Sequence, residues 1–124
     1  MSGPSLARAE LAVMELLWES ERLTAREIRE KLYPRSTRAQ HGTVQKLLQR
    51  LEEKGLVARD RKLAVHLFSA RLTREAYAGG QLESLAEDLT GGSLAPMLTH
   101  LLDHERLSDE EIARLRRLLD GKGA

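Results

Sequence analysis

The chain has 124 residues, enough for one medium domain or two very small ones, and a formal net charge of +1. It contains no cysteine, which excludes disulfides and thiolate metal sites. No apolar run approaches the roughly 20 residues of a membrane span, and the N-terminus lacks the apolar core of a signal peptide, so we expect a cytoplasmic protein.

Two helices are predicted in the first quarter of the chain. Apolar residues at three- and four-residue intervals indicate a helix over about residues 6–20. Thr24 and Glu27 form a capping-box pattern that opens a second helix over about residues 25–32. Between the two helices, Leu23 is expected to form a brief strand or a hydrophobic staple.

A third helix is predicted over about residues 43–54, after a polar turn at residues 35–42. Gly55 follows it and can take the left-handed conformation that closes a helix. The segment 56–69 predicts two short strands around a basic turn, Arg59–Lys62. The apolar stripe of the third helix, expected to face the core, consists of Val44, Leu47, Leu48 and Leu51.

Three further helices are predicted in the second half, over about residues 73–89, 94–104 and 109–120. Each carries a narrow apolar stripe with little to pack against inside one small chain. Such faces most simply bury against a second copy, so we predict a homodimer. The residues expected in this interface are Leu82, Leu85, Leu89, Leu94, Met97, Leu98, Leu101, Leu102, Ile112, Leu115, Leu118 and Leu119.

The order helix, short strand, helix, turn, helix and hairpin is that of a winged helix-turn-helix. We therefore predict a mainly α fold, a winged helix-turn-helix with a small β-hairpin wing plus a C-terminal helical dimerisation domain. The expected domains are residues 6–71 for DNA binding and 72–120 for dimerisation. Residues 1–70 carry 13 basic and 9 acidic side chains, whereas residues 71–124 carry 7 and 10. This asymmetry suggests a polyanionic partner for the first half.

The third predicted helix has the side chains that a DNA-recognition helix needs. Long amide and basic side chains lie opposite its apolar stripe, and the acids Glu52 and Glu53 come only late in the helix. In the major groove, Arg and Lys donate to guanine, Gln pairs with adenine, and Thr contacts the thymine methyl group. The expected base-contacting residues are Thr43, Gln45, Lys46, Gln49 and Arg50.

Phosphate contacts are expected around this helix, from the second helix, the turn before the third, and the wing. A helix N-terminus offers backbone N–H donors, and Lys and Arg give salt-dependent affinity without reading sequence. The expected residues are Thr24, Ala25, Arg26, Arg35, Arg38, His41, Arg59, Arg61 and Lys62. The alternative predictions are a winged-helix module for protein contacts and a regulator that senses a small ligand.

Five segments resemble, in chain order, the penicillinase-repressor family (BlaI/MecI type): ELAVMELLWE, LTAREIREKL, TVQKLLQRLEEKGLVAR, LTREAY and LSDEEIARLRRLL. The resemblance extends from about Ala9 to Leu119. It implies a homodimeric transcriptional repressor of inverted-repeat operators, typically those of β-lactamase or other antibiotic-resistance genes. It also implies an inducing protease of a membrane sensor system as partner, with a cleavage region that aligns near His100–Leu101.

No other group of residues in the sequence suggests an enzyme, a cofactor or a metal site. His100 and His104 are four residues apart on one predicted helix, a spacing that can bind zinc. Catalytic zinc needs a third protein ligand, and Leu101 stands where HxxxH enzymes carry a glutamate. We therefore expect a surface or interface pair of histidines and no metal.

Overall fold

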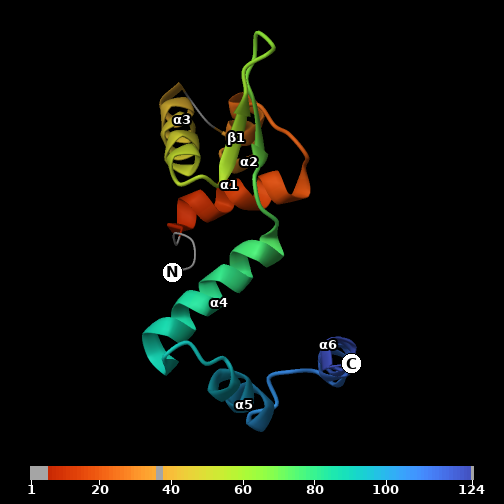
Figure 1. The fold of residues 1–124 in the computed structure, drawn as a ribbon. Coiled ribbons are helices and arrows are strands. Elements are labelled where there is room, and N and C mark those ends of the chain that lie inside the picture. Colours follow the sequence, from red (N-terminus) through yellow and green to blue (C-terminus); the bar gives the residue numbers. More distant parts are fainter. Residues whose placement is uncertain (1–5, 36–37, 124) are drawn as a thin grey trace. The chain divides into compact units, whose positions relative to one another are not determined.

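The computed structural model describes residues 6–35 and 38–123, which are mainly helical (Figure 1). The strands β1 (Val57–Asp60) and β2 (Leu67–Ala70) form one antiparallel hairpin. The predicted fold class, a winged helix-turn-helix followed by C-terminal helices, is confirmed. The helices are α1 (Arg8–Glu19), α2 (Ala25–Leu32), α3 (Arg38–Glu53), α4 (Arg74–Thr90), α5 (Ala95–Asp103) and α6 (Asp109–Gly123).

The chain divides into two compact units between Gln81 and Leu82. The first unit holds α1 to β2 and the start of α4, and the second holds the rest of α4 with α5 and α6. Within the first unit, Trp18 Nε1 donates to the backbone oxygen of Leu72 at 3.0 Å, and the Trp18 and Tyr77 rings lie 5.9 Å apart. These contacts attach the start of α4 to α1.

One apolar core lies between the three helices and the hairpin of the first unit. Each fully buried side chain of Val, Leu, Ile, Phe or Met contributes about 1.5–3 kcal/mol relative to an exposed one. The predicted stripe of α3 is confirmed, because Val44, Leu47, Leu48 and Leu51 are all buried. The other members are Val13, Met14, Leu17, Leu23, Ile28, Leu56, Val57 and Phe68. This packing fixes the rotation of α3 about its own axis.

The hairpin pairs Val57 with Ala70 at its open end. Leu23 adds an isolated bridge to Phe68, in which the Leu23 N–H donates to Phe68 at 3.0 Å and the Phe68 N–H donates to Leu23 at 2.8 Å. Of the two predictions for Leu23, a brief strand or a hydrophobic staple, this single bridge favours strand-like pairing. This bridge ties the start of α2 to the wing.

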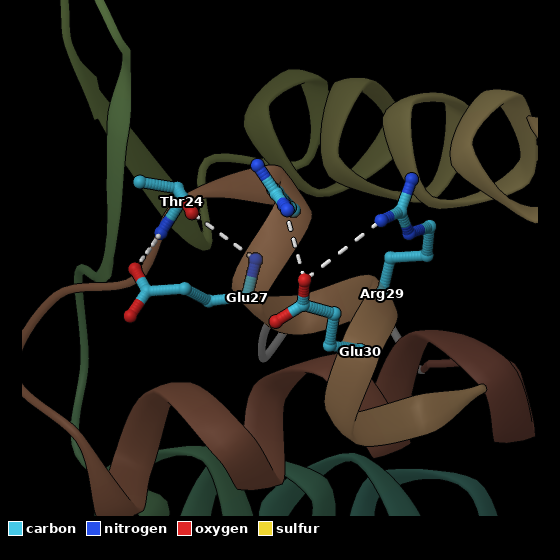
Figure 2. Close-up of polar contacts among 5 residues, drawn as sticks. Thr24, Glu27, Arg29 and Glu30 are labelled. Atoms are coloured by element: carbon cyan, nitrogen blue, oxygen red, sulfur yellow. Dashed lines mark hydrogen bonds and ion pairs between the residues drawn. The ribbon is translucent and has the colours of Figure 1, made fainter. Parts of the chain in front are cut away.

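Several helix ends follow the predicted local signals. Thr24 Oγ1 accepts from the Glu27 N–H at 3.1 Å, and Glu27 Oε1 accepts from the Thr24 N–H at 2.9 Å, which completes the capping box of α2 (Figure 2). Ser108 and Glu111 form the same reciprocal pair at the start of α6. Gly55 follows α3 with φ of 78°, the left-handed conformation expected of it.

The predicted start of the third helix is wrong. α3 begins at Arg38 rather than Thr43, so residues 38–42 are helical and not a polar turn. Gly42 suggested a turn, but one glycine costs a helix only about 1 kcal/mol, which the buried stripe that follows offsets. The earlier start places His41 inside α3.

The predicted turn of the wing is also wrong. Arg59 lies within β1, opposite Phe68, and the connection between the strands is residues 61–66. Burial of the Phe68 side chain sets this register of the two strands. The basic residues of the segment, from which the turn was predicted, gave no indication of it. The last helix continues to Gly123 instead of ending near Asp120, because a glycine lowers helix stability without stopping the helix.

An ion pair between a buried carboxylate and a half-buried lysine, absent from the sequence predictions, joins α1 to the end of α3. Glu10 is only 2% exposed, and its Oε1 accepts from Lys54 Nζ at 2.8 Å and from the Ala7 N–H at 2.9 Å. Burial alone raises the pKa of the Glu10 carboxyl, but these hydrogen bonds and the charges of Lys54 and Arg50 hold that pKa below its ordinary value. Ala9, the residue before Glu10, is exposed.

The second unit has almost no core of its own. Among its described residues only Ala86 is buried, whereas most leucines of α4, α5 and α6 are exposed. Leu89 and Leu119 are each 70% exposed. An amphipathic helix is stable mainly when its apolar face is covered. Within residues 6–35 and 38–123, no helix combines the length and apolar character needed to cross a membrane.

Replacing Glu10 by glutamine is expected to destabilise the first unit, because it removes the charge that pairs with Lys54. A lowered carboxyl pKa stabilises the fold above the ordinary glutamate pKa of about 4.3, and this stabilisation disappears as the pH falls through the folded-state pKa. Glu10→Gln should lower the free energy of unfolding by about 1–3 kcal/mol at pH 7, and by progressively less in the acidic range.

Urea unfolding followed by the fluorescence of Trp18, the single tryptophan, measures this difference. Glu15→Gln is the matched control, because it removes the same charge from an exposed position of α1. Its effect should stay within about 0.5 kcal/mol. Equal stabilities of Glu10→Gln and wild type at pH 7 would contradict the role assigned to the ion pair.

Candidate nucleic-acid interface

The outward surface of α3 carries two rows of polar side chains at the spacing of helical turns. The five predicted base-contacting residues are all exposed there, and His41 is half-buried beside them. The two rows are Thr43, Lys46 and Arg50 on one line, and His41, Gln45 and Gln49 on the next. Because the opposite face is held in the core, these rows are the part of α3 that can meet a partner.

A groove of about 530 Å³ separates the second row from the wing. It is lined by the start of α2, by α3 and by the hairpin. Val65 and His66 line its wing side and were not among the predicted contacts. The predicted contacts that the fold brings together around it are Thr24, Ala25, Arg26, His41, Gln45, Gln49 and Arg59.

The start of α2 contributes backbone donors to this groove. The Thr24 hydroxyl caps the Glu27 N–H, but the first N–H groups of an α-helix have no intrahelical acceptor, so those of Ala25 and Arg26 suit an anion. Arg26 Nε donates to Glu30 at 3.0 Å, an exposed pair one helical turn apart. Such a pair contributes little, so Arg26 is easily redirected to a phosphate.

Arg59 is held within the protein rather than presented to solvent. Its Nη2 lies 2.6 Å from Glu52 Oε1, and its guanidinium lies over the Phe68 ring, 4.8 Å from the centroid. Arg61 Nη2 lies 3.6 Å from the other oxygen of Glu52. One carboxylate at the end of α3 therefore offsets two arginines of the wing.

Four predicted phosphate contacts do not line the groove. Arg35 is exposed in the connection before α3, and Arg38 is the first residue of that helix. Arg61 and Lys62 are exposed and line a separate depression, beside Arg22. Arg61 and Lys62 are therefore exposed positive charges of the wing that lie outside the groove.

His100 of α5 and His104, the residue that follows this helix, are both exposed in the second unit. The His100 and His104 rings stack with centroids 4.1 Å apart, and His104 Nδ1 donates to the backbone oxygen of His100 at 2.9 Å. The described residues contain no group of three or more His, Cys, Asp or Glu side chains that could hold a metal ion. The predicted cleavage region, His100–Leu101, is exposed but helical.

Helices α1 to α3 with the hairpin beside them make this a winged helix-turn-helix protein, and the amide and basic rows of α3 make DNA its natural partner. Among known protein families, the model of the penicillinase repressor family matches residues 6–121 of this chain. The chain belongs to the penicillinase repressor family, as its motifs predicted. This is a family of DNA-binding transcriptional repressors, which is not a class of enzyme.

Individual relatives match over most of their length. The penicillinase repressor of Bacillus licheniformis is 27% identical over 117 residues, which are 94% of this chain and 91% of that protein. The transcriptional regulator BlaI of Mycobacterium tuberculosis is 36% identical over 116 residues, which are 92% of this chain and 82% of that protein. Among solved structures, the DNA-binding domain of the repressor BlaI is 25% identical, with a TM-score of 0.49 and coverage of 62% of this chain and 94% of that one.

Removing the charge of Glu52 is expected to strengthen binding to DNA. Glu52→Gln releases Arg59 and Arg61 from their shared carboxylate and raises the positive charge beside the groove by one. We expect the affinity for a duplex of arbitrary sequence to rise roughly threefold to tenfold at about 50 mM salt, because phosphate contacts supply this affinity. Fluorescence anisotropy of a labelled duplex measures it.

Glu75→Gln is the control for net charge, since this exposed residue of α4 does not line the groove. It should raise the affinity much less than Glu52→Gln does. If the two variants bind equally, Glu52 has no special influence on the wing arginines.

Proposed function

We propose that the chain represses transcription as a homodimer that binds an inverted-repeat operator through α3. The observation that carries this proposal is the exposed polar surface of α3 with its adjoining groove, in a chain of the penicillinase repressor family. Two relatives bear the names penicillinase repressor and transcriptional regulator. β-Lactamase and other antibiotic-resistance genes are therefore the first class of targets to examine.

In the proposed complex, α3 lies in the major groove, which is about 12 Å wide and admits one helix. Lys46 and Arg50 donate to guanine O6 and N7. Gln45 and Gln49 pair with adenine, and Thr43 contacts a thymine methyl group. These pairings require side chains held on one side of the helix, which the buried stripe of α3 ensures.

The groove between α3 and the wing suits the sugar–phosphate strand that borders the major groove. The N–H groups of Ala25 and Arg26 and the positive end of the α2 dipole attract a phosphate, and the Arg26 side chain adds charge. Arg61 and Lys62 add charge from the wing. These contacts set the register of α3 on the duplex without reading its sequence.

The proposed homodimer accounts for the exposed leucines of the second unit. Because Ala86 alone is buried among its described residues, α4, α5 and α6 need an external surface to cover their apolar faces. A second copy carries the same faces, so one self-complementary interface can cover both. Two α3 helices joined in this way bind two half-sites far more tightly than one helix binds alone.

Anything that separates the subunits would release the operator. The family resemblance assigns this step to a protease of a membrane sensor system that acts near His100–Leu101. α5 has nine residues, none of them buried. A helix this short is marginal without packing, so it can open locally to admit a protease.

The proposed base contacts are tested by Lys46→Ala and Arg50→Ala. Each variant should weaken binding to the operator by about 1–3 kcal/mol, because each loses a donor to a base edge. Both residues are exposed, so the fold should stay intact. Fluorescence anisotropy with the duplex that the wild-type protein selects from a random pool gives the affinities, and circular dichroism checks the fold.

Arg71→Ala provides the matched control, because it removes one exposed positive charge from a residue that does not line the groove. It should weaken binding only slightly, and equally for all sequences. Operator affinity unchanged in both Lys46→Ala and Arg50→Ala would rule out α3 as the reading helix.

A further inference from the structure

Three consecutive apolar residues stand exposed at the end of the wing. Leu63 is 63% exposed, Val65 is 59% exposed, and Ala64 between them is exposed as well. We call Leu63–Val65 the apolar wing tip; it lies in the connection that projects beyond the paired strands (Figure 1). Turns are normally polar, and a run of three exposed apolar residues is unfavourable unless it serves a function.

The apolar wing tip is carried on a hairpin that is held by contacts next to the tip and by Phe68 in the core. Asp60 Oδ1 accepts the Lys62 N–H at 2.9 Å, and Asp60 Oδ2 lies 3.8 Å from Arg22 Nη1. Phe68, paired with Arg59 across the ladder, is buried in the core. The hairpin therefore presents the tip at a defined place in the first unit.

The tip adjoins the surface that we propose reads DNA. Ala64 and Val65 line the same groove as Gln45 and Gln49 of α3. Arg61 and Lys62 come directly before the tip and are exposed, and the connection of residues 61–66 contains no acidic residue. A basic and apolar surface of this kind matches a nucleic acid, which presents negative phosphates beside the apolar C–H edges of its sugars.

We propose that Leu63 and Val65 pack against deoxyribose rings in the minor groove next to the half-site read by α3. This inference rests on the proposed function. A helix in the major groove leaves the neighbouring hairpin beside the adjacent minor groove, across one sugar–phosphate strand. The minor groove is about 6 Å wide, so it admits side chains but no helix. Arg61 and Lys62 then reach the phosphates along its edge.

An apolar contact of this kind has a distinctive dependence on salt. Packing against a sugar neutralises no phosphate and releases no counterion, so it adds affinity without changing how steeply affinity falls with salt. Its strength depends on the width of the minor groove, which varies with base sequence. The wing tip would therefore create a sequence preference beside the half-site, at positions where no side chain reads a base.

The test compares four full-length proteins on the duplex selected by the wild type: wild type, Leu63→Ser with Val65→Ser, Leu63→Met with Val65→Ile, and Lys62→Ala. Affinity is measured by anisotropy at several salt concentrations, and hydroxyl radicals, which attack sugars from the minor groove, map the contacts. The serine variant should bind roughly fivefold to thirtyfold more weakly with an unchanged salt slope. It should also lose sugar protection beside the half-site.

The other two variants separate apolar contact from charge. The Met/Ile variant keeps the apolar character and should retain wild-type affinity and protection. Lys62→Ala should reduce the salt slope by about 1 while keeping the sugar protection. Because all three positions are exposed, these changes remove nothing from the core.

Wild-type affinity and sugar protection in the serine variant would overturn the inference, would leave the proposed function standing, and would direct attention to a protein partner for the tip. Failure of the wild-type protein to bind any duplex selectively would instead overturn the proposed function, and this inference with it.

Discussion

Burial of one face of α3 is the constraint on which the rest of the structure depends. Its apolar stripe packs against α1, α2 and the hairpin, and helical periodicity then decides which side chains face outward. The ion pair between the buried Glu10 and the half-buried Lys54 fastens the end of the same helix to α1. The packing of this one helix therefore determines which polar side chains are exposed, where the groove beside them lies, and where the wing is placed.

The net positive charge around α3 is small, because an acidic residue offsets part of it. Glu52 offsets Arg59 and Arg61, while Lys46 and Arg50 remain exposed on the outward face. Non-specific affinity grows with the number of phosphates neutralised, so restrained charge favours contacts that depend on sequence. Residues 71–124, with 7 basic and 10 acidic side chains, carry a net negative charge. These residues contribute the exposed leucines of α4, α5 and α6. We propose that these leucines join two copies of the chain and so bring two α3 helices to one operator.

Patterns of neighbouring residues predicted most helices and strands, whereas contacts between different elements could not be predicted from the sequence. The stripe of α3, the capping boxes and Gly55 each depend on residues within a few positions of one another. Glu10 precedes Val13 and Leu17 at helical spacing, which could have marked it as buried, but only the fold reveals Lys54 as its partner. Arg59 looked like a free phosphate contact because the sequence does not show that β1 places it against Glu52.

We propose that two copies of α3 read the two halves of one operator. Selection from a pool of random duplexes by the purified protein, near physiological salt and followed by sequencing, tests it most directly. We expect an enriched inverted repeat whose half-sites lie about one helical turn, roughly 10 base pairs, apart or a multiple of it. If a protein shown to be folded enriches no sequence, or only a single unrepeated half-site, that result would contradict the proposed dimeric binding.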